Sequence, residues 1–173
     1  MNIIQTKRLL LRELELTDAD FILELLNESG FLRFIGDKGV RTLTDAREYI
    51  RKGPIDSYGR YGFGLYLTSL RDGTPIGICG LVKRDGLSDV DVGFAFLSRH
   101  QSKGYAVESA SAVLAHGRHL LNLQRIVAIT SPENFGSIAV LEKIGLTFEG
   151  MIVLEEGSPP LKLFAPVQPE SLS

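Results

Sequence analysis

The stretch VDVGFAFLSRHQSKGYAVES, residues 90–109, carries the fullest structural signal in this chain. Its first part is rich in apolar and aromatic residues typical of a β-strand, which we place at 90–98. Five polar or charged residues, 99–103, then precede Gly104, and an apolar pattern with helical spacing runs over 105–121. The stretch therefore predicts a strand, a polar loop and a helix in direct succession.

Similar patterns on both sides of this stretch predict further elements. Helices are expected to begin after Thr17 and Thr44 and to cover 135–144, where Gly145 suits the end of a helix. Strands are expected at 7–14, 63–70, 75–83, 125–131, 146–155 and 161–167. This order predicts a mixed α+β or α/β domain, with helices on both faces of one sheet. We expect a single domain over 1–167 and a flexible tail over 168–173.

Composition limits the class of protein. The 173 residues suit one domain, 44% of them are hydrophobic, and the formal net charge of −2 does not favour nucleic acid as a partner. The single cysteine, Cys79, excludes an intrachain disulfide and is interpreted as a buried apolar residue. No apolar run is long enough for a transmembrane helix, and the charged N-terminus does not resemble a signal peptide. We expect a cytoplasmic protein without a membrane partner.

The polar loop before the helix has two interpretations. It is an ordinary capped loop, or it is a seat for an anion, because the first N–H groups of a helix lack partners and carry partial positive charge. Gly104 permits a tight turn and a close approach of a ligand, and Arg99 and Lys103 add positive charge, which together favour a pyrophosphate. Gly93, inside the preceding strand, indicates a bulge or a ligand lying close to the backbone.

A second motif, SPENFGSIAVLEKIGLTFEG, spans residues 131–150. Asn134 is a good helix N-cap, which is its structural interpretation. Asn134 and Ser137 also follow the end of a strand, where α/β sheets tend to bind ligands.

Together these segments resemble the GNAT acyltransferase superfamily, in the branch that contains N-acetyltransferases of ribosomal-protein N-termini. VGFAFLSRHQSKGYAVES is similar to the acyl-CoA motif of that family, NFGSIAVLEKIGLTFEG to its second motif, and TKRLLLRELELTDAD to its opening strand and helix. The resemblance covers about residues 6–165.

The resemblance implies a mostly antiparallel sheet of about six to seven strands, splayed between the fourth and fifth (90–98 and 125–131). It implies that the pantetheine arm of acetyl-CoA pairs with the first of these strands and that N–H groups of 102–107 hold the pyrophosphate. An N–H near Phe96 would stabilise the oxyanion. The residues so assigned to acetyl-CoA are Phe94, Ala95, Phe96, Gln101, Ser102, Lys103, Gly104, Tyr105, Ala106, Val107 and Asn134.

The family reacts by direct attack of an amine on the thioester, which requires a base for the amine and an acid for the thiolate. Two familiar catalytic positions are altered here, with Leu141 in place of a tyrosine acid and Ile129 in place of a glutamate base. Ser137 is the candidate acid or merely a residue of the first helical turn. Asp91, which with Asp89 should share one strand face, is the candidate base or an exposed strand carboxylate.

The sequence leaves the acceptor open. We predict acetyl-CoA-dependent transfer of an acetyl group to a primary amine, foremost a protein or peptide α-amino group. The alternatives are a small amine, such as a polyamine or an antibiotic, and a module that binds acyl-CoA without catalysis. No metal is expected, because His116 and His119 lack a third ligand, and His100 is interpreted as part of the loop lining. The protein is expected to be a monomer or a homodimer.

Overall fold

The computed structural model describes residues 2–167; the predicted flexible tail, 168–173, lies outside them. Eight strands form one sheet in the order β1-β2-β3-β4-β5-β6-β8-β7. The strands are β1 (Asn2–Gln5), β2 (Leu9–Glu13), β3 (Leu65–Leu70), β4 (Pro75–Val82), β5 (Val90–Phe96), β6 (Ile126–Thr130), β7 (Leu146–Ile152) and β8 (Leu161–Pro166). All neighbouring strands pair antiparallel except β5 and β6, which are parallel. The mixed, mostly antiparallel sheet is confirmed, and β1 is an additional strand that the sequence analysis missed.

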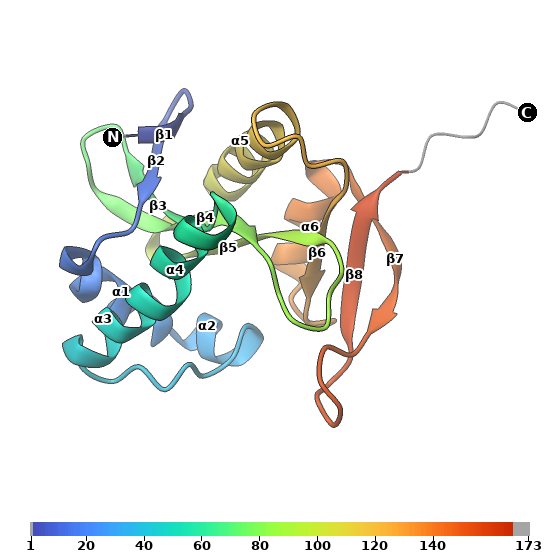
Figure 1. The fold of residues 1–173 in the computed structure, drawn as a ribbon, viewed down its shortest axis with the longest axis horizontal. Helices are drawn as coiled ribbons and strands as arrows, with labels where there is room; N and C mark the ends of the chain where they lie inside the picture. The colour runs from blue at the N-terminus through green and yellow to red at the C-terminus, as the bar shows by residue number, and fades with distance from the viewer. Residues whose placement is uncertain (1, 168–173) are drawn as a thin grey trace, which may run out of the picture.

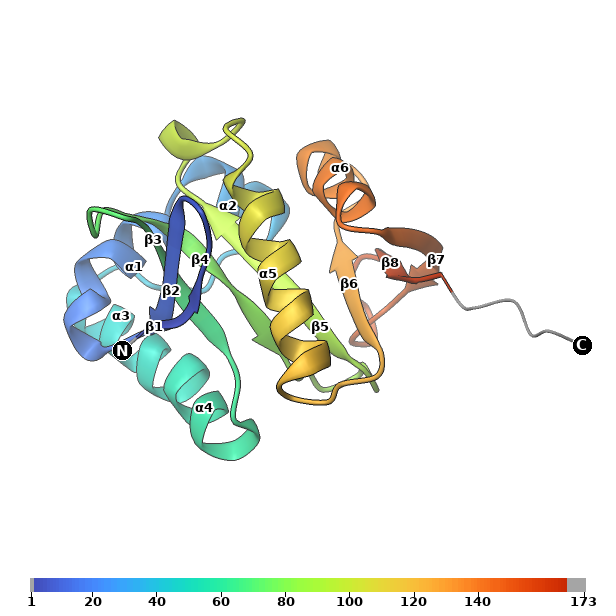
Figure 2. The ribbon, with the colours of Figure 1, turned by 90° about the horizontal axis from the view of Figure 1, so that it is seen from above.

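Helices cover both faces of this sheet, as Figures 1 and 2 show. One core joins the sheet to α5, and a second joins it to the N-terminal helices through Ile22, Ile50 and Ile78. The helices are α1 (Ala19–Leu26), α2 (Ser29–Phe34), α3 (Leu43–Ile50), α4 (Asp56–Tyr61), α5 (Tyr105–His119) and α6 (Phe135–Lys143). A π-helical segment, Arg51–Ile55, joins α3 to α4, so that the two helices form one continuous rod in Figure 1.

Helix α5 shows how sequence pattern produces this packing. Ala110, Val113 and Leu114 lie on its buried face, against the sheet. The helix ends at His119, earlier than predicted, and Leu120 is 70% exposed rather than part of the apolar face. Burial of the three apolar side chains against β4 and β5 fixes the N-terminus of α5 beside the end of β5.

The central strands carry the residues that the sequence analysis interpreted as core. Cys79 is fully buried in β4, as predicted. Gly80 lies opposite Gly93, and the register between β4 and β5 is continuous, so the bulge considered at Gly93 is absent from the described pairing. A side chain at Gly80 would collide with the backbone of Gly64, which explains a glycine there. Among residues 2–167, no helix has the length and apolar character needed to cross a bilayer.

Candidate active site

The two parallel strands at the centre of the sheet separate soon after they meet. β5 and β6 pair only through Val90 with Ile126 and Asp91 with Val127. Beyond these pairs β6 instead continues its pairing with β8, through Ala128 to Thr130. The predicted splay is therefore confirmed: the strands that form its sides are the fourth and fifth predicted ones, numbered β5 and β6 because β1 precedes them.

The splay exposes one hydrogen-bonding edge of β5. The N–H of Leu97 donates to the carbonyl of Ile76 over 3.0 Å, which sets the phase of the antiparallel ladder with β4. Because bonded pairs alternate, the polar backbone groups of Ala95 point toward β4, whereas those of Phe94 and Phe96 point toward the opening. The sequence analysis assigned all three residues to acetyl-CoA. The pairing with β4 instead leaves the backbone groups of Phe94 and Phe96 facing the opening, and those of Ala95 bonded to β4.

The loop that leads into α5 presents a row of unused donors. Within residues 2–167, the backbone N–H groups of 102–107 have no hydrogen-bond acceptor, and the first N–H that α5 satisfies is that of Glu108, which donates to Gly104. Ser102 and Gly104 both have positive φ, 61° and 82°, and turns of this kind can group successive N–H groups into a concave anion-binding site. A concave set of N–H groups at the start of a 15-residue helix is suited to an anion.

An arginine that the sequence analysis did not single out supports this loop from outside. Arg8, before β2, donates from Nη1 to the carbonyl of Lys103 over 2.9 Å and from Nε to Glu108 Oε1 over 2.7 Å. Its guanidinium also stacks on Tyr105, with 4.6 Å between Cζ and the ring centroid. Glu108 further accepts from the backbone N–H of Arg8 and from the hydroxyl of Thr6. The N-terminal hairpin thus fixes both the loop and the first turn of α5.

Three polar residues of the loop region make contacts that the sequence analysis did not predict. Arg99 forms an ion pair with Glu24 of α1 over 2.5 Å, so that its charge is already compensated, contrary to its predicted contribution to the anion seat. Gln101 donates from Nε2 to the carbonyl of Phe96 over 3.0 Å and ties the loop to the end of β5. Lys103 is exposed, and within the described residues only its carbonyl takes part in a hydrogen bond, with Arg8.

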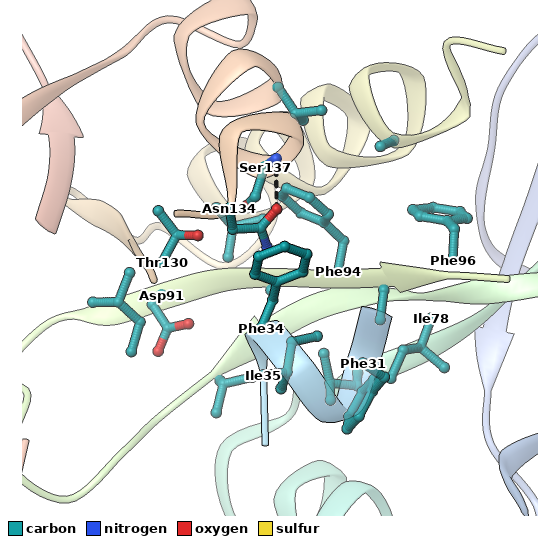
Figure 3. Close-up of a pocket in the computed structure, with 18 of the residues that line it drawn as sticks. Phe31, Phe34, Ile35, Ile78, Asp91, Phe94, Phe96, Thr130, Asn134 and Ser137 are labelled. Atoms are coloured by element: carbon teal, nitrogen blue, oxygen red, sulfur yellow. Dashed lines mark hydrogen bonds between the residues drawn. The ribbon is translucent and has the colours of Figure 1, made fainter. Parts of the chain in front are cut away.

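The second motif begins helix α6 at the other side of the opening. Asn134 is its N-cap, as predicted, and accepts from the N–H of Ser137 over 3.2 Å (Figure 3). Ser137 lies in the first turn, and its hydroxyl makes no hydrogen bond within the described chain. Leu141 is the buried residue of α6 and packs in the core, which explains the apolar residue in place of a tyrosine. Ile129 lines the cleft from β6 and provides no base.

Asp91 is buried, with 1% of its surface exposed, so the interpretation as an exposed strand carboxylate is wrong. Its Oδ2 accepts from Arg84 Nε over 2.8 Å. Burial raises the pKa of Asp91, and Arg84 and Lys83 oppose that rise. Asp89 precedes β5 and forms an ion pair with Arg125 over 3.0 Å, so the two aspartates are paired with different arginines.

These residues surround one cleft with a volume of about 1330 Å³, which passes between the splayed strands. Figure 3 shows Phe94, Asn134 and Ser137 on one side of β5 and Asp91 with Phe31 of α2 on the other, and the ring of Phe34 overlaps the strand in this view. The opening between β5 and β6 therefore joins two chambers. The first contains the unpaired N–H groups of 102–107, and the second contains a buried carboxylate and aromatic side chains.

The histidines do not form a metal site in the part of the chain that is described, where no three candidate ligands converge. His116 packs edge-on against Tyr66 at 6.5 Å between ring centroids, and burial lowers its pKa. His100 lines the cleft beside the loop, as predicted.

Residues 8–147 match the family described as acetyltransferase (GNAT) domain. The chain belongs to the GNAT family. It is 36% identical over 148 residues to an uncharacterized N-acetyltransferase, YnaD, of Bacillus subtilis, and the match covers 85% of this chain and 84% of YnaD. A GNAT-family acetyltransferase of Bacillus anthracis superposes with a TM-score of 0.77 at 29% identity, covering 94% of this chain and 96% of that one.

The fold is also shared with RimL, a ribosomal-protein α-N-acetyltransferase solved in complex with coenzyme A. The TM-score is 0.83 at 17% identity, with coverage of 96% of this chain and 98% of RimL. As a GNAT acetyltransferase this protein is an acyltransferase, and acetyl-CoA is its donor. The open edge of β5 and the N–H groups of 102–107 fit such a donor, since one supplies strand-like hydrogen bonds and the other a seat for phosphate.

Proposed function

We propose that this GNAT acetyltransferase transfers the acetyl group of acetyl-CoA to the α-amino group of a protein or peptide, by direct attack of the amine on the thioester. The observation that carries the proposal is the opening between β5 and β6, which joins two chambers on opposite faces of the sheet. Two substrates that enter from opposite faces can meet in that opening with their reacting atoms in line. Such positioning supplies a large share of the rate in a reaction between two bound molecules.

The donor occupies the first chamber. Its pyrophosphate accepts hydrogen bonds from N–H groups of 102–107, while Gln101 and Arg8 hold the loop in place. The pantetheine arm lies along the open edge of β5 at Phe94 and Phe96, in the manner of an added strand. The free N–H of Phe96 is the donor best placed to stabilise the oxyanion that forms on the thioester oxygen.

The acceptor occupies the second chamber, where Asp91 is the base. The amine nitrogen attacks the carbonyl carbon, the amine proton passes to Asp91 directly or through water, and the carbon–sulfur bond breaks. The Ser137 hydroxyl then protonates the departing thiolate and recovers its proton from solvent. A raised carboxyl pKa makes Asp91 a stronger base than an ordinary aspartate, and the lack of a hydrogen bond at the Ser137 hydroxyl leaves it available.

The lining of the cleft supports a peptide acceptor. Its volume of about 1330 Å³ exceeds the roughly 300–1,000 Å³ typical of pockets for one small ligand, as a cleft that holds a donor and an acceptor together requires. Ile35, Tyr61 and Phe135 line the cleft yet are 46%, 44% and 75% exposed, which provides apolar surface for a larger partner. RimL, which shares the fold, is named as an acetyltransferase of a protein α-amino group.

The test is mass-spectrometric detection of acetyl transfer from acetyl-CoA. Peptides with free N-termini are compared with the same peptides whose N-termini are formylated and whose lysines are free, and with polyamines. We expect acetylation at the α-amino group only. Acetylation confined to polyamines or to lysine side chains would contradict the α-amino assignment. Binding of acetyl-CoA without any acetylated product would contradict the catalytic proposal itself.

A further inference from the structure

The second chamber contains more positive than negative charge around the proposed base. Lys38 reaches it from the loop between α2 and α3, and Lys83 and Arg84 follow the end of β4. Asp91 is the carboxylate that two of these cations share: Arg84 pairs with it at 2.8 Å, and Lys83 contributes an attractive charge. Lys38, the third cation, gains no such attraction from Asp91.

Lys38 has no ion-pair partner in the part of the chain that the structure describes. Within residues 2–167 it takes part in no ion pair and no hydrogen bond, whereas Lys83 Nζ donates to the carbonyl of Leu87 over 2.7 Å. Enclosure by the cleft walls lowers the pKa of Lys38, and the neighbouring Arg84 lowers it further, with no carboxylate acting in the opposite direction. The Lys38 ammonium therefore faces like charge in a partly enclosed space, although its side chain remains accessible to a ligand.

Other charged residues of the cleft have partners or lie in solvent. Arg60 pairs with Asp56 over 3.6 Å, and Lys52 pairs with Glu48 over 3.2 Å. Asp85 lines the cleft but is exposed and makes no ion pair in the described chain. Of Lys38, Lys83 and Arg84, only Arg84 forms an ion pair in the described chain, and Lys38 is the one that also makes no hydrogen bond.

We propose that the acceptor is an acidic peptide, whose carboxylate near the N-terminus pairs with Lys38 while its α-amino group approaches Asp91. The inference rests on the proposed function, because it assumes an amine acceptor in the second chamber. The donor does not supply this anion, since its phosphates fit the N–H groups of 102–107, on the other side of β5. A polycationic acceptor would be repelled by Lys38, Lys83 and Arg84 at the point where its amine must react.

The experiment compares matched acceptors at fixed acetyl-CoA. The peptides have amidated C-termini and begin with Asp or Asn, or with Glu or Gln, so that one carboxylate is the only difference. Free aspartate and polyamines form separate arms. Release of coenzyme A is followed with a thiol reagent; the single cysteine is fully buried, and burial raises its pKa to about 12, so it will not interfere. The chain is tested as wild type, Lys38→Gln, Lys38→Arg and Lys52→Gln.

We expect kcat/KM to be about tenfold or more higher for the acidic peptide of each pair, as one charge-assisted hydrogen bond allows. Lys38→Gln should bring the ratio to within about twofold, Lys38→Arg should keep a preference, and Lys52→Gln should leave the ratio unchanged because Glu48 already neutralises Lys52. The KM for acetyl-CoA should be the same in all four proteins.

Four results would overturn the inference. The first is equal kcat/KM for the acidic and neutral peptides, and the second is a preference for polyamines. The third is a Lys38→Gln protein with a raised KM for acetyl-CoA and an unchanged ratio of kcat/KM between acidic and neutral peptides, which would assign Lys38 to donor binding. The fourth is free aspartate reacting faster than every peptide, which would assign the anion to a small acceptor. Transfer without a carboxylate preference overturns this inference alone, whereas no transfer to any amine overturns the proposed function as well.

Discussion

Arg8 and Glu108, 100 residues apart in the sequence, meet at 2.7 Å between Nε and Oε1 and join the N-terminal hairpin to the first turn of α5. Arg8 also donates to the carbonyl of Lys103, so the same guanidinium holds the loop and the first turn of α5. Its Nη2 lies 3.1 Å from the position that a side chain at Gly104 would occupy. The shape of the seat therefore depends on the N-terminal hairpin as well as on the loop sequence.

Replacement of this arginine should weaken donor binding. Arg8→Ala removes two hydrogen bonds and the stacking on Tyr105, and we expect the Kd for acetyl-CoA to rise about tenfold, as charge-assisted hydrogen bonds imply. Isothermal titration calorimetry measures the change. The control is Arg118→Ala, an exposed arginine in the last turn of the same helix, which should bind normally. An unchanged Kd for Arg8→Ala would show that the N-terminal hairpin does not contribute to acetyl-CoA binding.

A side chain at Gly104 should block the seat directly. Gly104→Val places a branched residue at φ 82°, which costs about 1–3 kcal/mol of folding free energy, and crowds Arg8 Nη2. We expect acetyl-CoA binding to be lost at concentrations that saturate the wild type, and the melting temperature to fall by several degrees. Gly59→Ala, in open space on α4, should retain binding. Normal affinity in a folded Gly104→Val protein would exclude the loop as the phosphate seat.

Removal of the proposed base should affect turnover and spare donor binding. We expect Asp91→Asn to lower kcat about 10²- to 10⁴-fold, the usual contribution of a general base, with an unchanged Kd for acetyl-CoA. Steady-state kinetics and calorimetry on the same preparation separate the two effects. Equal kcat values in the two proteins would remove Asp91 from the mechanism.

The pH profile tests the same residue independently. The base must be deprotonated, and burial raises the pKa of Asp91, so kcat should increase with pH through a value above that of an ordinary aspartate. The effect on stability has the opposite sign: the raised carboxyl pKa favours the folded state at low pH, and this contribution is lost as pH rises through the folded pKa. Asp91→Asn should abolish both dependences. If kcat still increases with pH in that variant, the titrating group is a residue other than Asp91.

Ser137 can be tested without disturbing the helix that carries it. Asn134 caps α6 through the backbone N–H of Ser137, so Ser137→Ala removes the hydroxyl and leaves the cap. We expect kcat to fall by about 10²-fold or more if the hydroxyl is the acid, because proton transfer by a positioned group contributes at that level. Thermal melting serves as the control for folding. A kcat equal to that of the wild type would reduce Ser137 to a residue of the first helical turn.

Much of this fold follows from local sequence signals. Alternation and apolar runs located the strands from β2 to β8, and Asn134 and Gly145 marked the two ends of α6. The missed elements lack such signals. The β1 strand has four residues and an irregular register with β2, and α2 has six residues without a side-chain cap. Helix α4 continues from α3 through the segment containing Pro54, a residue that normally indicates a break.

The parts of the candidate site that consist of residues adjacent in the sequence could be predicted. The loop 101–107 and the cap at Asn134 are local motifs, and both lie where they were predicted. The contacts of Arg8 with Glu108, of Arg99 with Glu24 and of Lys38 with the second chamber join residues from distant segments, and no spacing rule connects them. The burial of Asp91 and its ion pair with Arg84 likewise have no signal in the alternation of β5.

The most direct measurement is a crystal structure of the protein with coenzyme A and a peptide acceptor. The account predicts the pyrophosphate on the N–H groups of 102–107, the pantetheine arm beside Phe94 and Phe96, and the peptide amine facing Asp91 through the opening between β5 and β6. A donor bound elsewhere, or a peptide that reaches the thioester from the same side of β5 as the pyrophosphate, would contradict it.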